Sequence, residues 1–158
     1  MKEREVTVRG EYFLRLERGE DVLPAIADFC KRKGILSGSF RAIGAVEQAK
    51  IGFYDLPSKK YGNKEYPEAM EVASMTGNIA QVDPIREPHS ASNGAGGSPF
   101  VHCHAVLSGI AAGTENQPVG GHVFEAKVAV TLEVHLVAFN ESIVRSLDDD
   151  IGLKLLDL

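Results

Sequence analysis

The sequence predicts a single α+β domain in which one main helix packs against a mainly antiparallel β-sheet. Three observations support this fold class. One early segment has the apolar spacing of a helix, and most later segments have the composition of strands. The length of 158 residues suits one domain with a substantial buried core, and no internal repeat or linker divides the chain. We therefore treat 1–158 as one domain.

The predicted helix covers residues 21–33. Basic residues fill its last turn, and Gly34 follows as the expected C-cap. Pro24 falls in the first turn, where a proline's missing N–H does little harm. One apolar stripe at helical spacing would face the sheet, and it consists of Val22, Ile26, Phe29 and Cys30.

Strands are expected on both sides of this helix. The segment 6–16 is predicted as a bent strand or strand pair, with Gly10 at a turn or bulge. Residues 56–68 contain two prolines, a glycine and an asparagine, and they are predicted as a turn between strands. The other predicted strands are 39–46, 49–54, 71–79, 100–107, 122–130, 128–139 and 143–147.

Two polar segments interrupt or follow these strands. Residues 82–99 are predicted as a long flexible loop, which suits either plain disorder or a lid over a site. Asp148 begins a short acidic segment that we expect to open the tail. In 128–139, alternation predicts Val128, Val130 and Leu132 on one face and Glu133 on the other.

Composition narrows the class of protein. The net charge is −5, and no long basic run is present, which disfavours a free-standing nucleic-acid binder. The two cysteines, Cys30 and Cys103, do not form a C-x-x-C motif or a disulfide framework. The amino-terminal residues lack an apolar signal region, and no run reaches transmembrane length. These features predict a cytoplasmic protein.

The most informative motif is His102-Cys103-His104, followed by His122 after Gly120-Gly121. Side chains alternate along a strand, so His102 and His104 point to one face and Cys103 to the other. The glycines would let a neighbouring strand approach closely and bring His122 beside that pair. Three imidazoles with an open fourth position form a zinc-type site. The alternative is three ordinary strand histidines that pack or hydrogen-bond at the surface.

Glu133 and His135 form a second pair on one strand face. Glu133 is a candidate general base, a fourth ligand, or an acceptor for an imidazole N–H. Its alternative role is a salt bridge with Arg41 or Arg145. His135 is the weaker candidate and is expected to be an exposed strand residue, while Cys103 is expected in the core.

Several segments resemble the PPC domain family, named for its occurrence in plants and prokaryotes. The resemblance runs through nearly the whole chain in the family's order. It implies a mainly antiparallel sheet flanked by helix, and a homotrimer. The matching segments are GSFRAIGAVEQAKIGFYD (38–55), EVASMTGNIA (71–80), VHCHAVLS (101–108), GGHVFEAKVAVTLEV (120–134) and IVRSLDDDIGLKLLDL (143–158).

Plant members of this family carry AT-hook motifs that bind A·T-rich DNA, and this chain has none. Stand-alone prokaryotic members include proteins with the His-x-His and Gly-Gly-His pattern, which implies a divalent metal, zinc above all. The resemblance therefore places the chain in the metal-binding prokaryotic branch, with His102, His104 and His122 as ligands.

Two functions follow as hypotheses. The first is a metal-binding homotrimer that senses or acts on a small molecule, with Glu133 as a candidate catalytic residue and Arg41 holding an anionic group. The second is a DNA-associated or protein-assembly module without catalysis. In the second, phosphate contacts would come from a surface that bears Arg41, Lys59, Lys60 and Lys64. The sequence assigns no substrate and no reaction.

Overall fold

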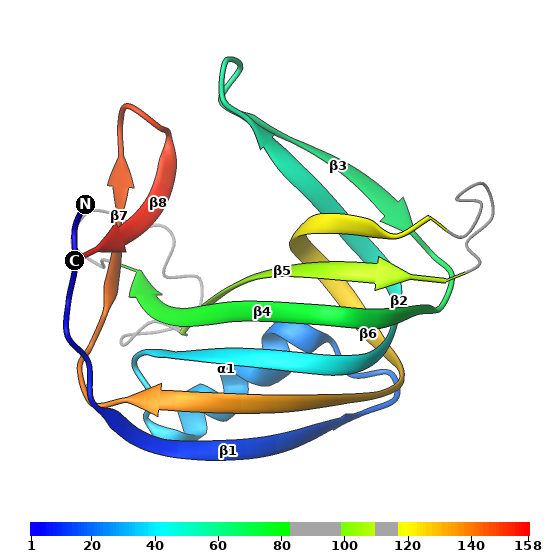
Figure 1. Ribbon diagram of the computed structural model, residues 1–158, viewed down its shortest axis with the longest axis horizontal. Helices are drawn as coiled ribbons and strands as arrows, with labels where there is room; N and C mark the ends of the chain where they lie inside the picture. Colours follow the sequence, from blue (N-terminus) through cyan, green and yellow to red (C-terminus); the bar gives the residue numbers. More distant parts are fainter. Residues whose placement is uncertain (83–98, 110–116) are drawn as a thin grey trace.

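The structure is a computed structural model that describes residues 1–82, 99–109 and 117–158. The predicted loop 82–99, including His89, falls almost entirely outside the described residues. The α+β class is confirmed, with a single helix and a mainly antiparallel sheet in the described part of the chain (Figure 1). The elements are β1 (Val8–Glu17), α1 (Val22–Lys33), β2 (Gly38–Asp55), β3 (Lys60–Tyr66), β4 (Met70–Val82), β5 (Phe100–Ser108), β6 (Val119–Phe139), β7 (Val144–Asp148) and β8 (Leu153–Asp157).

Two long strands, β2 and β6, organise the sheet. They pair antiparallel over most of their length, and β5 and β4 connect them a second time, so the pairings close in the order β2–β6–β5–β4–β2. The edge strand β1 extends the sheet from the second half of β6, and β3 folds back on β2 as a hairpin. A parallel contact between β4 and β7 attaches the β7–β8 hairpin (Figure 1).

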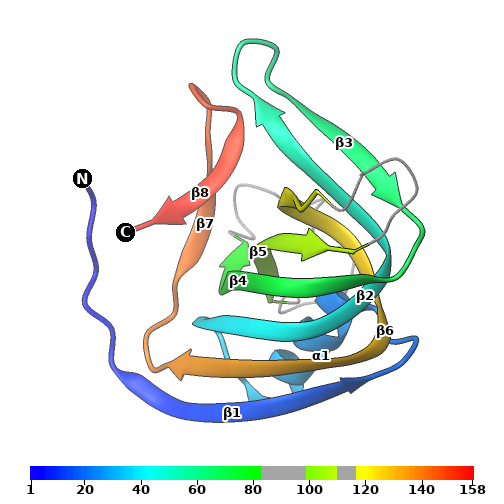
Figure 2. The ribbon, with the colours of Figure 1, turned by 45° about the vertical axis from the view of Figure 1, so that its right-hand side comes forward.

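Helix α1 packs on the buried face of the sheet, against β5 and β6 (Figure 2). Asp21 is its N-cap residue, and Gly34 ends it in the left-handed conformation with φ 62°. Of the predicted stripe, Val22, Ile26 and Cys30 are fully buried, and Phe29 is partly buried against the core. They join one core with side chains from the inner faces of β2, β4, β5 and β6.

The two predicted strands 39–46 and 49–54 form one strand, β2, which is distorted near Gln48, where φ is 51°. The prediction that 56–68 is only a turn was wrong, because it contains β3. Most side chains of β3 are exposed, so the strand is held by its backbone pairing to β2 and has no apolar alternation to reveal it.

The predictions for the last third of the chain also need correction. The segments 122–130 and 128–139 belong to one strand, β6, and Val130 is 68% exposed. Gly44 and Val46 lie on β2, and the part of β6 that pairs with them contains extra residues. This bulge in β6 turns Val130 out of the core. Asp148 does not open a tail: it ends β7, and its Oδ1 accepts a hydrogen bond from the Ile151 N–H at 2.9 Å in the turn to β8.

The face of the sheet opposite α1 is largely open to solvent, and we call it the outer face. One row of register partners crosses it from β1 to the first part of β6. Side chains directly opposite one another in antiparallel strands lie on the same face, so this row places distant parts of the chain side by side. In order, the row is Phe13, His135, Arg41, Thr76, His104 and His122.

Candidate metal centre

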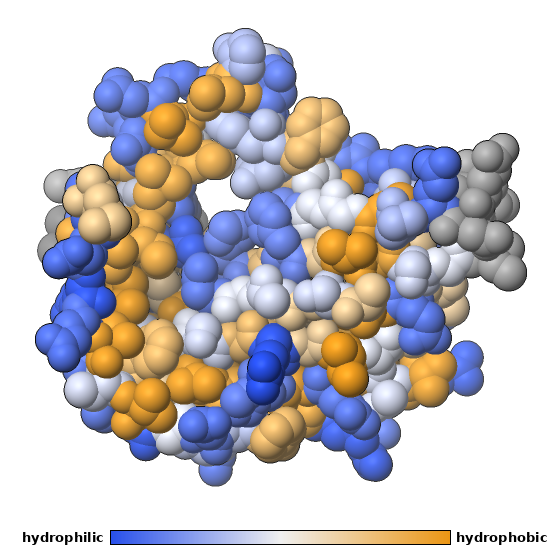
Figure 3. All heavy atoms as spheres, in the orientation of Figure 1, coloured by the Kyte–Doolittle hydropathy of each residue, from blue (hydrophilic) through white to orange (hydrophobic). Residues whose placement is uncertain are grey.

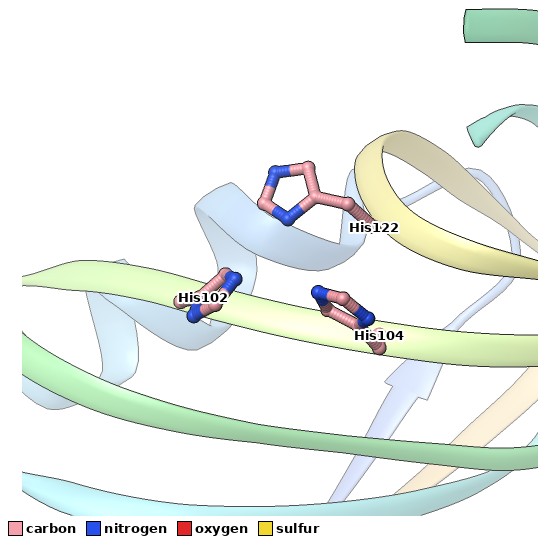
Figure 4. Close-up of side chains that lie close together, drawn as sticks. All are labelled: His102, His104 and His122. Atoms are coloured by element: carbon pink, nitrogen blue, oxygen red, sulfur yellow. The ribbon is translucent and has the colours of Figure 1, made fainter. Parts of the chain in front are cut away.

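Three histidines meet at one end of this row (Figure 4). His102 and His104 lie two residues apart on β5, and His104 is the register partner of His122 on β6. The ring centroids of the three pairs are 5.0 to 5.5 Å apart. One ring nitrogen from each residue lies within 4.8 Å of the others. Small side-chain rotations would bring the three nitrogens onto one ion at about 2.1 Å.

Gly121 explains how β6 comes so close. A Cβ atom there would lie 2.4 Å from the carbonyl oxygen of Gly52 on β2, and the φ of Gly121 is 154°. Only glycine fits this position without displacing backbone. β6 is therefore held tightly between β2 and β5, and His122 projects beside His104. The close approach to the histidine strand expected from Gly120-Gly121 is seen at Gly120, where a Cβ atom would lie 3.1 Å from the Ala105 carbonyl oxygen on β5, whereas Gly121 approaches β2.

Burial keeps two of the rings neutral. It lowers the pKa of His102 to about 4, with further contributions from the Arg145 cation and the other two histidines. Burial also lowers the pKa of His122, helped by His104 and Arg145. A neutral imidazole offers a lone pair to a metal. The Nδ1 atom of His122 is buried without a hydrogen-bond partner in the described structure, which is consistent with a role as a metal ligand.

Arg145 is the main residue of this site that the sequence analysis missed. It lies on β7, and only 5% of its surface is exposed. Its Nη2 donates to His102 Nδ1 at 3.2 Å and to Asn78 Oδ1 at 2.7 Å. Its Nη1 donates to the Lys154 carbonyl oxygen at 2.7 Å. No sequence spacing connects residue 145 with residue 102, because the parallel contact of β4 and β7 brings them together.

Aromatic side chains form a wall around the histidines. The Tyr61 and Phe124 rings lie 5.2 and 4.7 Å from the His122 ring, and Phe100 lies against the Arg145 guanidinium. Burial raises the pKa of Tyr61, reinforced by Tyr54 and opposed by Arg145. A shallow pocket of about 300 Å³ opens beside the trio, lined by Thr76, Gly77, Asn78, His102, Cys103 and His104.

Two hairpins meet beyond this wall. The Tyr54 hydroxyl donates to the Ile151 carbonyl oxygen at 2.7 Å, and Lys59 Nζ donates to the Asp149 carbonyl oxygen at 3.1 Å. These contacts join the β2–β3 hairpin to the β7–β8 hairpin. Figure 3 shows an opening below the joined hairpins, with hydrophilic residues along its lower edge.

The other predicted site residues lie apart from the trio. Arg41 is two strands from His104 along the row, about 10 Å at the usual strand spacing. Glu133 is exposed and lies eleven residues along β6 from His122. Its register partners on the neighbouring strands are Arg15 and Ile43. Glu133 makes no ion pair within the described residues, so neither expected arginine partner is present there.

The remaining two residues have structural contacts. Cys103 is 1% exposed on the opposite face, as expected, and burial raises its pKa to about 12. His135 is half-buried, not exposed: it stacks on Phe13 and its Nε2 lies 2.8 Å from Glu11 Oε2.

The four basic residues of the DNA hypothesis do not share one segment of the sheet. Lys59, Lys60 and Lys64 belong to the β2–β3 hairpin, whereas Arg41 lies in the first half of β2, beside β4 and the second half of β6.

The fold and the site together define a class: an α+β sheet domain with a three-histidine group on its outer face. The chain belongs to the family of the Plants and Prokaryotes Conserved (PCC) domain, whose model matches residues 3–140. The family inferred from the sequence resemblance is thereby confirmed. No curated protein matches the chain by sequence. The one helix that the structure describes, α1, is not long and apolar enough to cross a membrane.

Solved structures agree with this family. A metal-containing protein from Archaeoglobus fulgidus is 35% identical, with 98% of each chain covered and a TM-score of 0.81. A plant- and prokaryote-conserved protein from Pyrococcus horikoshii is 28% identical over 100% of this chain and 98% of its own, with a TM-score of 0.82. A Bacteroides thetaiotaomicron protein, described as a candidate DNA-binding protein, is 25% identical over 96% of each chain, with a TM-score of 0.77.

Proposed function

We propose that this protein binds one divalent metal ion per subunit, zinc in particular, through His102, His104 and His122, and that the bound ion takes a small molecule at its open position. The convergence of three ring nitrogens within 4.8 Å carries the proposal. The name of the Archaeoglobus fulgidus relative, a metal-containing protein, supports it. Three neutral nitrogen ligands suit zinc and leave a fourth position for water or a ligand oxygen.

The chain's own residues prepare this position. The low pKa of His102 keeps its ring neutral, so protons do not compete with a metal there near pH 7. The Tyr61 ring lies beside His122, and the pocket lined by Thr76 and Asn78 opens next to His102 and His104. When bound, zinc lowers the pKa of a water molecule or polarises a carbonyl group.

Roles for Arg41 and Glu133 are part of the proposal. Arg41, about 10 Å from His104 along the row, would hold an anionic group of a longer ligand. Glu133 would accept a proton at the metal site of a neighbouring subunit, because within its own chain it lies far along β6 from His122. When the protein is loaded with Co²⁺, the visible absorption spectrum of the ion should change with pH as its bound water loses a proton. Glu133→Gln should shift the midpoint pH of this change. An unchanged transition would remove Glu133 from the site.

We also propose that the protein is a homotrimer and that the outer face forms part of the contact. Three large apolar side chains of this face are unusually exposed: Phe13 by 83%, Ile43 by 58% and Val106 by 44%. Large apolar side chains that are exposed on one face are the kind that a protein–protein contact buries.

The test of the metal proposal is a histidine double variant. His102→Ala with His104→Ala should lose stoichiometric metal, measured by plasma mass spectrometry, and retain the wild-type circular dichroism spectrum. The matched control is His135→Ala, which removes a histidine of the same face that lies outside the trio. Metal retained in the double variant, or lost equally in the control, would reject the assignment.

The second candidate is a DNA-associated or protein-assembly module. The name of the Bacteroides thetaiotaomicron relative favours it, and the net charge of −5 opposes direct DNA contact. Direct binding of the protein to duplex DNA would favour the DNA-associated function.

A further inference from the structure

Arg145 is a buried cation without an acidic partner among the described residues. Its hydrogen-bond acceptors are all neutral: His102 Nδ1, Asn78 Oδ1 and the Lys154 carbonyl oxygen. Its Nε is buried and has no partner in the described structure. A buried guanidinium with an unpaired donor is costly unless an anion completes it.

The contact between Arg145 and His102 cannot coexist with a metal on His102. Arginine only donates, so His102 Nδ1 accepts from Nη2 and the proton of the neutral ring lies on Nε2. A metal at Nδ1 would take the arginine's place. A metal at Nε2 would move the proton to Nδ1, where it would face the arginine N–H, donor against donor. In both cases metal binding frees Nη2 from His102.

Charge balance then requires an anion. The trio contributes three neutral imidazoles and no carboxylate. A divalent ion and the guanidinium would bring two and one positive charges, three in all, into a partly buried site. Nη2 keeps its hydrogen bond to Asn78 Oδ1, and the N–H that loses His102 joins the unpaired Nε, so two donors of one guanidinium can hold the two oxygens of a carboxylate.

We propose that the small-molecule ligand of the metal site is a carboxylate, with one oxygen on the metal and the carboxylate group held by Nη2 and Nε of Arg145. This inference rests on the proposed metal site. The rings of Tyr61, Phe100 and Phe124 provide an apolar wall for the rest of the ligand. Arg145 is the one cationic side chain in contact with the trio among the described residues, and its two available N–H donors match the two oxygens of a planar carboxylate.

The experiment uses the full chain loaded with Co²⁺, whose visible spectrum reports the ligands of the ion. Acetate, pyruvate and inorganic phosphate are titrated separately. The wild-type spectrum should respond to the two carboxylates, and Arg145→Gln should weaken their binding by about tenfold or more, with Co²⁺ stoichiometry unchanged. Arg15→Gln is the matched control, an exposed arginine paired with Glu17. It should leave carboxylate binding as in wild type.

A second measurement separates this role from a structural one. Calorimetric titration with Co²⁺ alone should show equal or tighter binding to Arg145→Gln, because the competing hydrogen bond to His102 is gone. Arg145→Lys, which keeps the charge, serves if Arg145→Gln fails to fold. Weaker Co²⁺ binding in a folded variant, or a response to phosphate alone, would overturn the inference. Loss of carboxylate binding in Arg41→Gln but not in Arg145→Gln would overturn it too.

The two proposals fail differently. A wild-type protein that binds no metal rejects the metal site and this inference together. A wild-type protein that binds Co²⁺ in a one-to-one ratio but responds to no carboxylate rejects the carboxylate ligand and leaves the metal site standing.

Discussion

His104 on β5 and His122 on β6 are register partners in the antiparallel sheet, and their ring centroids lie 5.5 Å apart. Register partners have Cβ atoms about 5 Å apart, so backbone pairing brings these two side chains side by side. The third ring, His102, joins them because it lies two residues from His104 on the same strand face. Sheet geometry therefore brings the trio together, and local side-chain rotation would suffice to place three ring nitrogens on one metal ion.

The metal-free protein should lose stability between pH 6.5 and about pH 4. The pKa of His102 is about 4 in the folded state and near 6.5 when unfolded, so in this window the unfolded chain binds more protons. The free energy of unfolding should fall as the pH falls, by on the order of 2 kcal/mol, reduced by the partial exposure of the ring. Urea denaturation at several pH values measures it. His102→Asn should flatten the dependence of the unfolding free energy on pH, and His135→Asn should not. Equal pH dependence in wild type and both variants would show that His102 is not the source of the effect.

Replacement of Gly121 should damage both the sheet and the site. A Cβ there would meet the Gly52 carbonyl oxygen at 2.4 Å, in a conformation that favours glycine. Gly121→Ala should lower the free energy of unfolding by about 2 kcal/mol and weaken zinc binding, as measured by calorimetry. Gly10→Ala is the control, because its Cβ would make only ordinary contacts with Tyr12. Wild-type zinc affinity in Gly121→Ala would show that close packing of β6 is not needed for the site.

A charge on the outer face should break the proposed trimer. Ile43→Asp would place a carboxylate in an apolar contact, so light scattering after gel filtration should show a single-chain mass, against a three-chain mass for wild type. Leu56→Asp, at a similarly exposed leucine between β2 and β3, is the control and should remain trimeric. A wild-type protein with a single-chain mass would reject the trimer outright.

Duplex DNA should not bind, even at low salt. The net charge is −5, and two of the three lysines have contacts of their own: Lys59 with the Asp149 carbonyl oxygen and Lys64 with the Tyr66 ring. Fluorescence anisotropy with a labelled A·T-rich duplex checks this. Binding whose affinity falls linearly with salt on a log–log plot would support the DNA-associated function instead.

Local signals predicted much of the fold correctly. The stripe Val22, Ile26 and Cys30 and the glycine after the last basic turn located α1 almost to the residue, because both are consequences of helix geometry. The exposed hairpin strand β3 and the outward turn of Val130 were missed. The first depends on backbone pairing alone and the second on a bulge, and neither leaves an apolar pattern in the sequence.

The sequence by itself determined that His102 and His104 share a face, because the two-residue period of a strand is a local property. It also indicated that a neighbouring strand could approach closely at Gly120-Gly121, because glycine lacks a Cβ, and the structure shows that Gly121 packs against Gly52 of β2. Tertiary structure alone decided that Arg145 contacts His102, and that Glu133 lies on the far part of β6 from His122. Strand order and register depend on the packing of the whole core, and no short sequence window contains that information.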